Sequence, residues 1–142
     1  MTINSLVPMK EFRDGPRVHQ DRRNTLDAAI DHRPYRLDLT ITGTGAGELL
    51  FRSDMRYKNG YIIRFDGENA ILFRLFRGQR TEIASAAAPL GKYSLIIAGS
   101  KFTLKKPNGA WVWHTTDTAV PTGLRMRYKL ESQKWTTVGR LL

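Results

Sequence analysis

Apolar and polar residues alternate along most of the chain after Tyr35. In the stretches Tyr35–Ile41 and Leu124–Leu130 every second residue is apolar, which is the pattern of a strand with one buried face. Turn signals such as Asp66-Gly67 separate the stretches. The pattern predicts an all-β domain of about ten short strands. The expected strands cover residues 35–41, 48–52, 61–65, 70–76, 81–84, 93–98, 102–105, 110–114, 124–130 and 135–142.

Residues 1–35 lack this alternation and are polar and charged. They predict an N-terminal arm that is extended apart from one short helix at Asn24–Ile30, where Asn24 or Thr25 would be the cap. Two interpretations of the arm stay open: a disordered tail, or a segment that orders on a neighbouring subunit. The predicted organisation is therefore an arm at residues 1–35 and a β-sandwich at residues 36–142.

Turn glycines and core aromatic residues follow one another in a distinctive order between Gly47 and Tyr128. The pieces are Phe51-Arg52, Asn59-Gly60-Tyr61, Phe73-Arg74-Leu75, Pro89-Leu90-Gly91-Lys92-Tyr93 and the segment from Asp117 to Tyr128. Their order and spacing resemble the concanavalin A-like lectin/glucanase superfamily, and especially its laminin G-like branch. The resemblance implies an antiparallel two-sheet jelly-roll β-sandwich. It does not imply one function, because this fold serves lectins, hydrolases, adhesion modules and virion proteins.

No arrangement of residues predicts catalysis or a bound cofactor. Glucanases of the superfamily carry Glu-x-Asp-x-x-Glu on one strand, and this motif is absent from the sequence. Asp66 and Glu68 lie in a turn, where carboxylates are normally solvated, and His114 stands alone on a strand. The chain has no cysteine and three scattered histidines, so we expect no metal site. Asp54 or Asp117 as a calcium ligand is a minor alternative.

The chain is strongly basic, with 23 Lys and Arg against 13 Asp and Glu and a formal net charge of +10. The excess lies on the β-rich part, which fits an anionic partner and equally a surface whose charge only keeps the protein soluble. Arg52, Arg64 and Arg74 fall on neighbouring strands and are predicted to form a row across one sheet. Arg125, Arg127 and Lys129 form a second row along one strand. Guanidinium groups match sulfate, phosphate and carboxylate, although both rows also fit an ordinary solvated face.

Two further groups of residues are candidates for contacts. Trp111 and Trp113 are two residues apart, so we expect them to share one face, either as a platform for sugar rings or as part of the core. Phe12, Trp135, Leu141 and Leu142 are candidates for contacts with other subunits. Nucleic acid ranks last among the ligands, because aromatic residues interleaved with basic ones are not evident.

The preferred hypothesis from the sequence is a non-catalytic structural or attachment module of a bacteriophage virion. It would decorate a capsid or belong to a tail, assemble in the host cytoplasm as a homo-oligomer, and use the arm to hold other virion subunits. No membrane span or signal peptide is evident in the sequence. The alternative is a lectin-like domain that binds anionic glycans. The third hypothesis is a degenerate glycoside hydrolase.

Overall fold

A computed structural model describes residues 34–123 and 125–142, apart from the side chain of Leu141. The described residues form strands joined by turns, and every strand pair is antiparallel. The prediction of an all-β domain is therefore confirmed. Residues 1–33 of the predicted arm, with its helix at 24–30 and Phe12, lie outside the described residues, and Tyr35 already belongs to the first strand. The strands are β1 (Tyr35–Ser53), β2 (Gly60–Phe65), β3 (Asn69–Phe76), β4 (Gln79–Ala87), β5 (Lys92–Ala98), β6 (Lys101–Lys105), β7 (Trp111–Thr116) and β8 (Arg125–Leu141).

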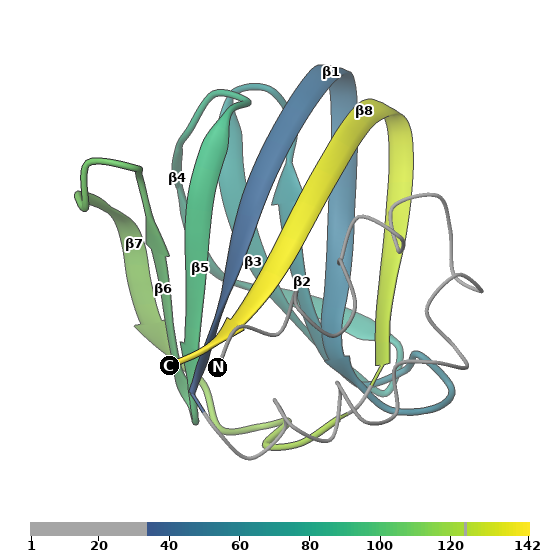
Figure 1. The fold of residues 1–142 in the computed structure, drawn as a ribbon. Coiled ribbons are helices and arrows are strands. Elements are labelled where there is room, and N and C mark those ends of the chain that lie inside the picture. The colour runs from purple at the N-terminus through teal and green to yellow at the C-terminus, as the bar shows by residue number, and fades with distance from the viewer. Residues whose placement is uncertain (1–33, 124) are drawn as a thin grey trace.

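The long strands β1 and β8 connect the two halves of the molecule. The strand order is β4-β3-β2-β1-β5-β6-β7, and β8 pairs with β1 along nearly its whole length. Residues 47–51 of β1 pair with β2, whereas residues 35–40 pair with β5. Both strands arch over between the two halves (Figure 1). The sheet is thereby folded over, as in a β-sandwich or jelly roll.

The arch explains why the described residues form fewer strands than the sequence predicts. Gly43, Gly45 and Gly47 were expected to end one strand and begin another, but they only bend β1. Gly43 and Gly45 have φ values of 101° and 74°, a region that glycine adopts without steric cost. A register shift against β8 lies between Thr44 and Gly47, and such bulges bend strands. β8 likewise unites the expected strands at 124–130 and 135–142.

One hydrophobic core joins residues of the two halves. The alternating residues of Tyr35–Ile41 are buried as predicted, and they meet Phe65 of β2 and Phe102 of β6 in the same cluster. Trp135 is fully buried and donates its indole N–H to Gln133 Oε1 at 2.8 Å. The folded sheet thus agrees with a jelly-roll-like sandwich. Division into two separate sheets stays a prediction, because β1 and β8 run through both halves.

Candidate functional site

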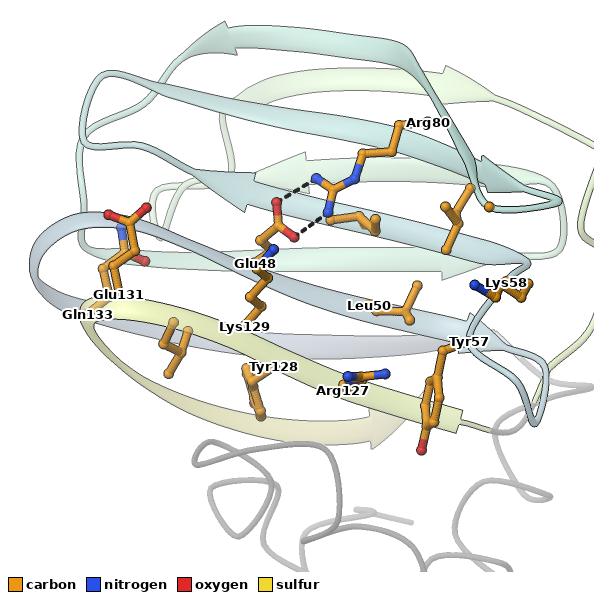
Figure 2. A pocket seen from close by; sticks show the side chains of 14 residues that line it. Glu48, Leu50, Tyr57, Lys58, Arg80, Arg127, Tyr128, Lys129, Glu131 and Gln133 are labelled. Carbon is orange, nitrogen blue, oxygen red and sulfur yellow. Dashed lines mark hydrogen bonds and ion pairs between the residues drawn. The ribbon is translucent and has the colours of Figure 1, made fainter.

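A groove of about 800 Å³ lies on the face of β8, β1, β2, β3 and β4 that points away from the core (Figure 2). Its volume is within the range of small-molecule sites, roughly 300–1,000 Å³. The β1–β2 loop closes one end of the groove. Its lining consists of Glu48, Leu50, Tyr57, Lys58, Ile62, Leu75, Gly78, Arg80, Arg127, Tyr128, Lys129, Leu130, Glu131 and Gln133.

Strand register arranges the groove in two adjacent rows, because directly paired residues of neighbouring strands point to the same face. The first row crosses the sheet through Lys129, Glu48 and Arg64 and carries the charges. The second row runs from Arg127 of β8 through Leu50, Ile62 and Phe73. A polar edge therefore runs beside an apolar strip.

Glu48 is the central residue of the first row, which we call the polar row. Its carboxylate accepts two hydrogen bonds from Arg80, at 2.6 and 2.7 Å, and one from Arg64 at 3.0 Å. The Glu48 side chain is 6% exposed, whereas those of Arg64 and Arg80 are 32% and 39% exposed. One buried negative charge thus holds two positive groups whose outer sides face solvent. Figure 2 shows Arg80 reaching from β4 to Glu48 over the sheet.

These contacts fix the charge state of the polar row. Burial of Glu48 opposes its ionisation, but the hydrogen bonds and charges of Arg80 and then Arg64 outweigh burial and lower the pKa of Glu48. The hydrogen bond to Glu48 in turn raises the pKa of Arg80. The three groups therefore carry their charges at neutral pH, with a net positive charge facing the groove.

The floor of the groove is apolar. Leu50, Ile62 and Leu75 are 8%, 4% and 7% exposed and form a small cluster separate from the main core, with Tyr57 and Phe73 packed against it. Guanidinium groups lie over both aromatic rings. The Arg127 guanidinium carbon is 4.8 Å from the centroid of Tyr57, and that of Arg80 is 5.6 Å from the centroid of Phe73. Such stacking keeps the cations beside the floor.

The predicted row of Arg52, Arg64 and Arg74 is wrong, because of the three only Arg64 lies on the groove side of the sheet, where it contacts Glu48 beside the groove. Arg74 pairs with Tyr61 in the β2–β3 register, so it shares the face of a core residue. In β3 it is Leu72 that belongs to the main core, whereas Phe73 and Leu75 belong to the small cluster on the groove side.

Arg52 lies on the core side as well. It is 5% exposed, and its guanidinium donates to Gly99 O at 2.7 Å and lies over the Phe102 ring. Its left-handed backbone (φ 51°) and a register shift between Leu50 and Ser53 redirect the side chain.

The second predicted row is partly in the groove. Arg127 and Lys129 line it. Arg125 contacts the sulfur of Met55 at 3.3 Å instead, at the end of the strand.

The two tryptophans do not share a face, contrary to the prediction. Trp111 is 62% exposed and stacks on His114, with ring centroids 5.1 Å apart. Trp113 is buried and donates to Ala70 O at 3.1 Å. The physical reason is a register shift between Leu104 and Lys105 opposite this pair, since a bulge breaks strict alternation.

The candidate assembly residues at the C-terminus have different environments. Trp135 is buried in the core of its own chain, whereas Leu142 is 54% exposed. The backbone of Leu141 pairs with Tyr35. Trp135 therefore does not offer its side chain to another subunit, and the assembly roles of Leu141 and Leu142 stay predictions.

The carboxylates considered for calcium or catalysis hold parts of the chain together. Asp54 accepts hydrogen bonds from the backbone of Lys58 and the side chain of Asn59. Asp117 accepts from the Tyr61 hydroxyl and from Arg74, both at 2.7 Å. Among the residues that the structure describes, no three His, Cys, Asp or Glu side chains gather in a way that would hold a metal ion. No helix in the described part of the chain is long and apolar enough to cross a membrane.

The sequence prediction missed most of the groove, including Glu48, Arg80, Leu50 and Ile62. A signal for the floor is present, because Leu49-Leu50-Phe51 and Tyr61-Ile62-Ile63 put apolar residues on both faces of neighbouring strands. A strand with one solvated face normally alternates apolar and polar residues. Consecutive apolar residues on both strands could therefore have predicted a second apolar face. The pairing of Arg80 with Glu48 depends on register and carries no local signal.

No protein-family model and no curated protein sequence matches the chain. Solved structures do match. A carbohydrate-binding module from Bacillus subtilis, CBM66, is 25% identical with a TM-score of 0.60, and the match covers 78% of this chain and 75% of that one. A galectin of Caenorhabditis elegans, LEC-6, matches with a TM-score of 0.55 at 12% identity over 77% of this chain and 81% of that one.

A sucrose-6-phosphate hydrolase from Lactobacillus gasseri also matches, with a TM-score of 0.55 at 16% identity over 80% of this chain. This chain spans about a quarter of the hydrolase, because the match covers 26% of that protein. These likenesses agree with a lectin-type β-sandwich of the concanavalin A-like kind. The laminin G-like branch stays a prediction.

Proposed function

We propose that this chain is a non-catalytic carbohydrate-binding module that holds an acidic oligosaccharide in the groove. The observation that carries the proposal is the pair of rows in the groove, in which half-exposed guanidinium groups border an apolar strip. The likeness to a carbohydrate-binding module and to galectins supports this function over the virion role. A virion location stays a prediction that nothing here tests.

The two rows match the two kinds of surface on a sugar ring. Leu50, Ile62 and the ring of Tyr57 offer an apolar surface for the C–H face of a pyranose or furanose. Arg64 and Arg80 have further N–H groups beyond those bound to Glu48, and these can donate to hydroxyl, carboxylate or sulfate oxygens. The sugar would lie across β1 and β2 with its polar edge toward the first row.

The charge of the groove favours an acidic sugar over a neutral one. Lys58, Arg80, Arg127 and Lys129 line the groove, and Arg64 lies beside it, whereas Glu48 and Glu131 neutralise only part of this positive charge. A carboxylate or sulfate substituent therefore gains electrostatic attraction that a neutral sugar lacks. This attraction weakens as salt is added, because the cations are partly exposed.

Glu48 is poorly suited to be the general acid of glycoside hydrolysis. A general acid for this reaction needs a raised pKa so that it holds a proton near neutral pH. The contacts with Arg80 and Arg64 instead lower the pKa of Glu48. The two arginines also occupy both oxygens of this carboxylate, which favours a structural role for Glu48 in a binding groove, although hydrolases are among the similar structures.

Calorimetric titration tests the proposal with sulfated or uronate oligosaccharides and neutral oligosaccharides of equal length. We expect binding of the acidic sugars that weakens with salt and that Arg80→Ala reduces. Arg36→Gln is the matched control, because Arg36 is ion-paired with Asp38 on the other half of β1, away from the groove. If neutral sugars bind as well as acidic ones, the preference for acidic sugars is wrong but the carbohydrate-binding function stands. Absence of binding to either class contradicts the function.

A further inference from the structure

Two apolar side chains protrude at the end of the molecule where the β1–β2 loop meets the β3–β4 turn. Met55 is 72% exposed and Phe76 is 42% exposed. Single exposed apolar residues are common, but these two lie at one edge of the sheet. Met55 follows the end of β1 and Phe76 ends β3, and both strands pair with β2 and end at the edge where β2 begins with Gly60.

Hydrogen bonds fix the two loops to each other. The Gly78 N–H donates to Lys58 O at 2.9 Å, and the Arg77 N–H donates to Asn59 Oδ1 at 2.8 Å. The Asp54 carboxylate holds the first loop from within, because it accepts from the Lys58 N–H at 2.9 Å and from Asn59 Nδ2 at 2.7 Å. The loops that carry Met55 and Phe76 are therefore held in place by hydrogen bonds.

Cations surround both apolar side chains. Arg125 contacts the Met55 sulfur at 3.3 Å, and the Arg77 guanidinium carbon lies 5.3 Å from the centroid of the Phe76 ring. Arg56 and Lys58 are exposed on the same loop. We call Met55, Arg56, Phe76 and Arg77 the basic rim; Lys58 lines the groove and Arg125 contacts Met55 from β8.

In the part of the chain that the structure describes, neither Arg56 nor Arg77 belongs to an ion pair. Among the described residues of the loops at this end, 54–59, 76–79 and 117–123, the carboxylates are those of Asp54 and Asp117. Asp54 braces its own loop, and Asp117 binds Tyr61 and Arg74 with a side chain that is 8% exposed. The rim thus presents a surplus of positive charge together with apolar tips.

We infer that the basic rim docks onto an anionic lipid surface, independently of what the groove binds. Met55 and Phe76 would enter the boundary between headgroups and acyl chains, and Arg56 and Arg77 would contact lipid phosphates. Protruding apolar side chains set among cations are the features by which proteins bind such surfaces. A soluble polyanion would use the cations but gain little from two apolar tips, so the lipid surface fits both features.

The experiment is co-sedimentation of the full chain with vesicles that contain no sugar lipid. We expect binding to phosphatidylcholine vesicles with 30% phosphatidylglycerol and little binding to phosphatidylcholine alone. Binding to the anionic vesicles should weaken as salt is added, because salt screens the cations of the rim. The double variant Met55→Ser/Phe76→Ser should weaken binding by about tenfold, because both apolar tips are lost. Arg56→Glu/Arg77→Glu should weaken it by at least as much.

Trp111→Ser is the matched control, because Trp111 is equally exposed but lies on the β6–β7 hairpin, away from the rim (Figure 1). It should leave vesicle binding unchanged. The inference is overturned if anionic and neutral vesicles bind alike, if neither binds, or if Met55→Ser/Phe76→Ser binds as the parent chain does. In that last case the rim is a site for soluble polyanions. Titration with free oligosaccharides reports on the groove separately.

Discussion

Two clusters of arginine and carboxylate lie on opposite faces of the same part of the sheet. The outer cluster consists of Glu48, Arg64 and Arg80 in the groove, and the inner cluster consists of Asp117, Arg74 and Tyr61 beside the core. Both carboxylates are nearly buried, at 6% and 8% exposed, and the pKa of both is lowered by their partners against the opposing effect of burial.

The clusters differ in how the carboxylate is shared. In the inner cluster one oxygen of Asp117 accepts from the Tyr61 hydroxyl and the Ala119 N–H, and the other accepts from Arg74. In the outer cluster two guanidinium groups share Glu48. The inner cluster is therefore close to neutral, while the outer one keeps a surplus positive charge beside an apolar floor. The same pair of residue types stabilises the fold in one place and, as we propose, binds a ligand in the other.

The largest expected effect comes from breaking the inner cluster. Asp117→Ala leaves the Arg74 charge and the Tyr61 hydroxyl without their buried partner, so it should lower the free energy of unfolding by about 3 kcal/mol. Arg80→Ala should cost only about 1 kcal/mol, because Arg64 still pairs with the nearly buried Glu48 carboxylate that Arg80 leaves behind. Urea denaturation measures both values. Equal losses would contradict the division of roles.

Breaking the outer cluster should change binding more than stability. Arg80→Ala removes a donor at the polar row, and we expect the affinity for an acidic oligosaccharide to fall by about tenfold, as for a charged hydrogen bond at a binding site. Arg74→Gln should change the affinity by less than about twofold, because Arg74 lies on the opposite face. Calorimetry on both variants tests this prediction. An equal fall in affinity in both variants would show that the groove is not the binding site.

Acid should weaken the fold through both carboxylates. The pKa of Glu48 and of Asp117 is lowered in the folded chain, so their contribution to stability is complete above the unfolded values of about 4 and disappears as pH falls through the lowered ones. The loss between pH 7 and pH 3 should be smaller in Asp117→Asn than in the parent chain. Denaturation curves at both pH values would show an unchanged loss if Asp117 were not ionised in the fold.

The smallest effect is expected at the edge of the groove. Lys129 pairs with Glu48 across β8 and β1, and its side chain is exposed. Lys129→Gln should lower the affinity for acidic sugars by about twofold at low salt and by less at high salt, because an exposed charge acts through a screened field. A salt-independent loss would instead indicate a direct hydrogen bond to the ligand.

The strand pattern and most of the turns were predictable from the sequence, because alternation and turn residues are local signals. Asp66-Gly67 forms the expected turn, with Asp66 Oδ1 accepting from the Asn69 N–H at 2.7 Å. The arches of β1 and β8 were not predicted, since glycines that end a strand and glycines that bend it look the same in sequence.

The site was less predictable because register decides which residues meet. A register shift between β6 and β7 separates Trp111 and Trp113, which alternation placed on one face. The β2–β3 register pairs Arg74 with Tyr61 and so places Arg74 on the core face. The net basic charge of the sequence is consistent with an anionic partner, and the proposed ligand is likewise anionic. Which arginines face that partner followed only from the pairing of the strands.

The most direct test of the central claim is to map the bound sugar on the protein by amide chemical-shift changes in NMR spectra. On titration with an acidic oligosaccharide, the account predicts changes centred on Leu50, Ile62, Arg80 and Arg127, and little change at Arg36 and Trp111. Changes centred on Arg36, Trp111 or another surface, with the groove residues unaffected, would contradict it.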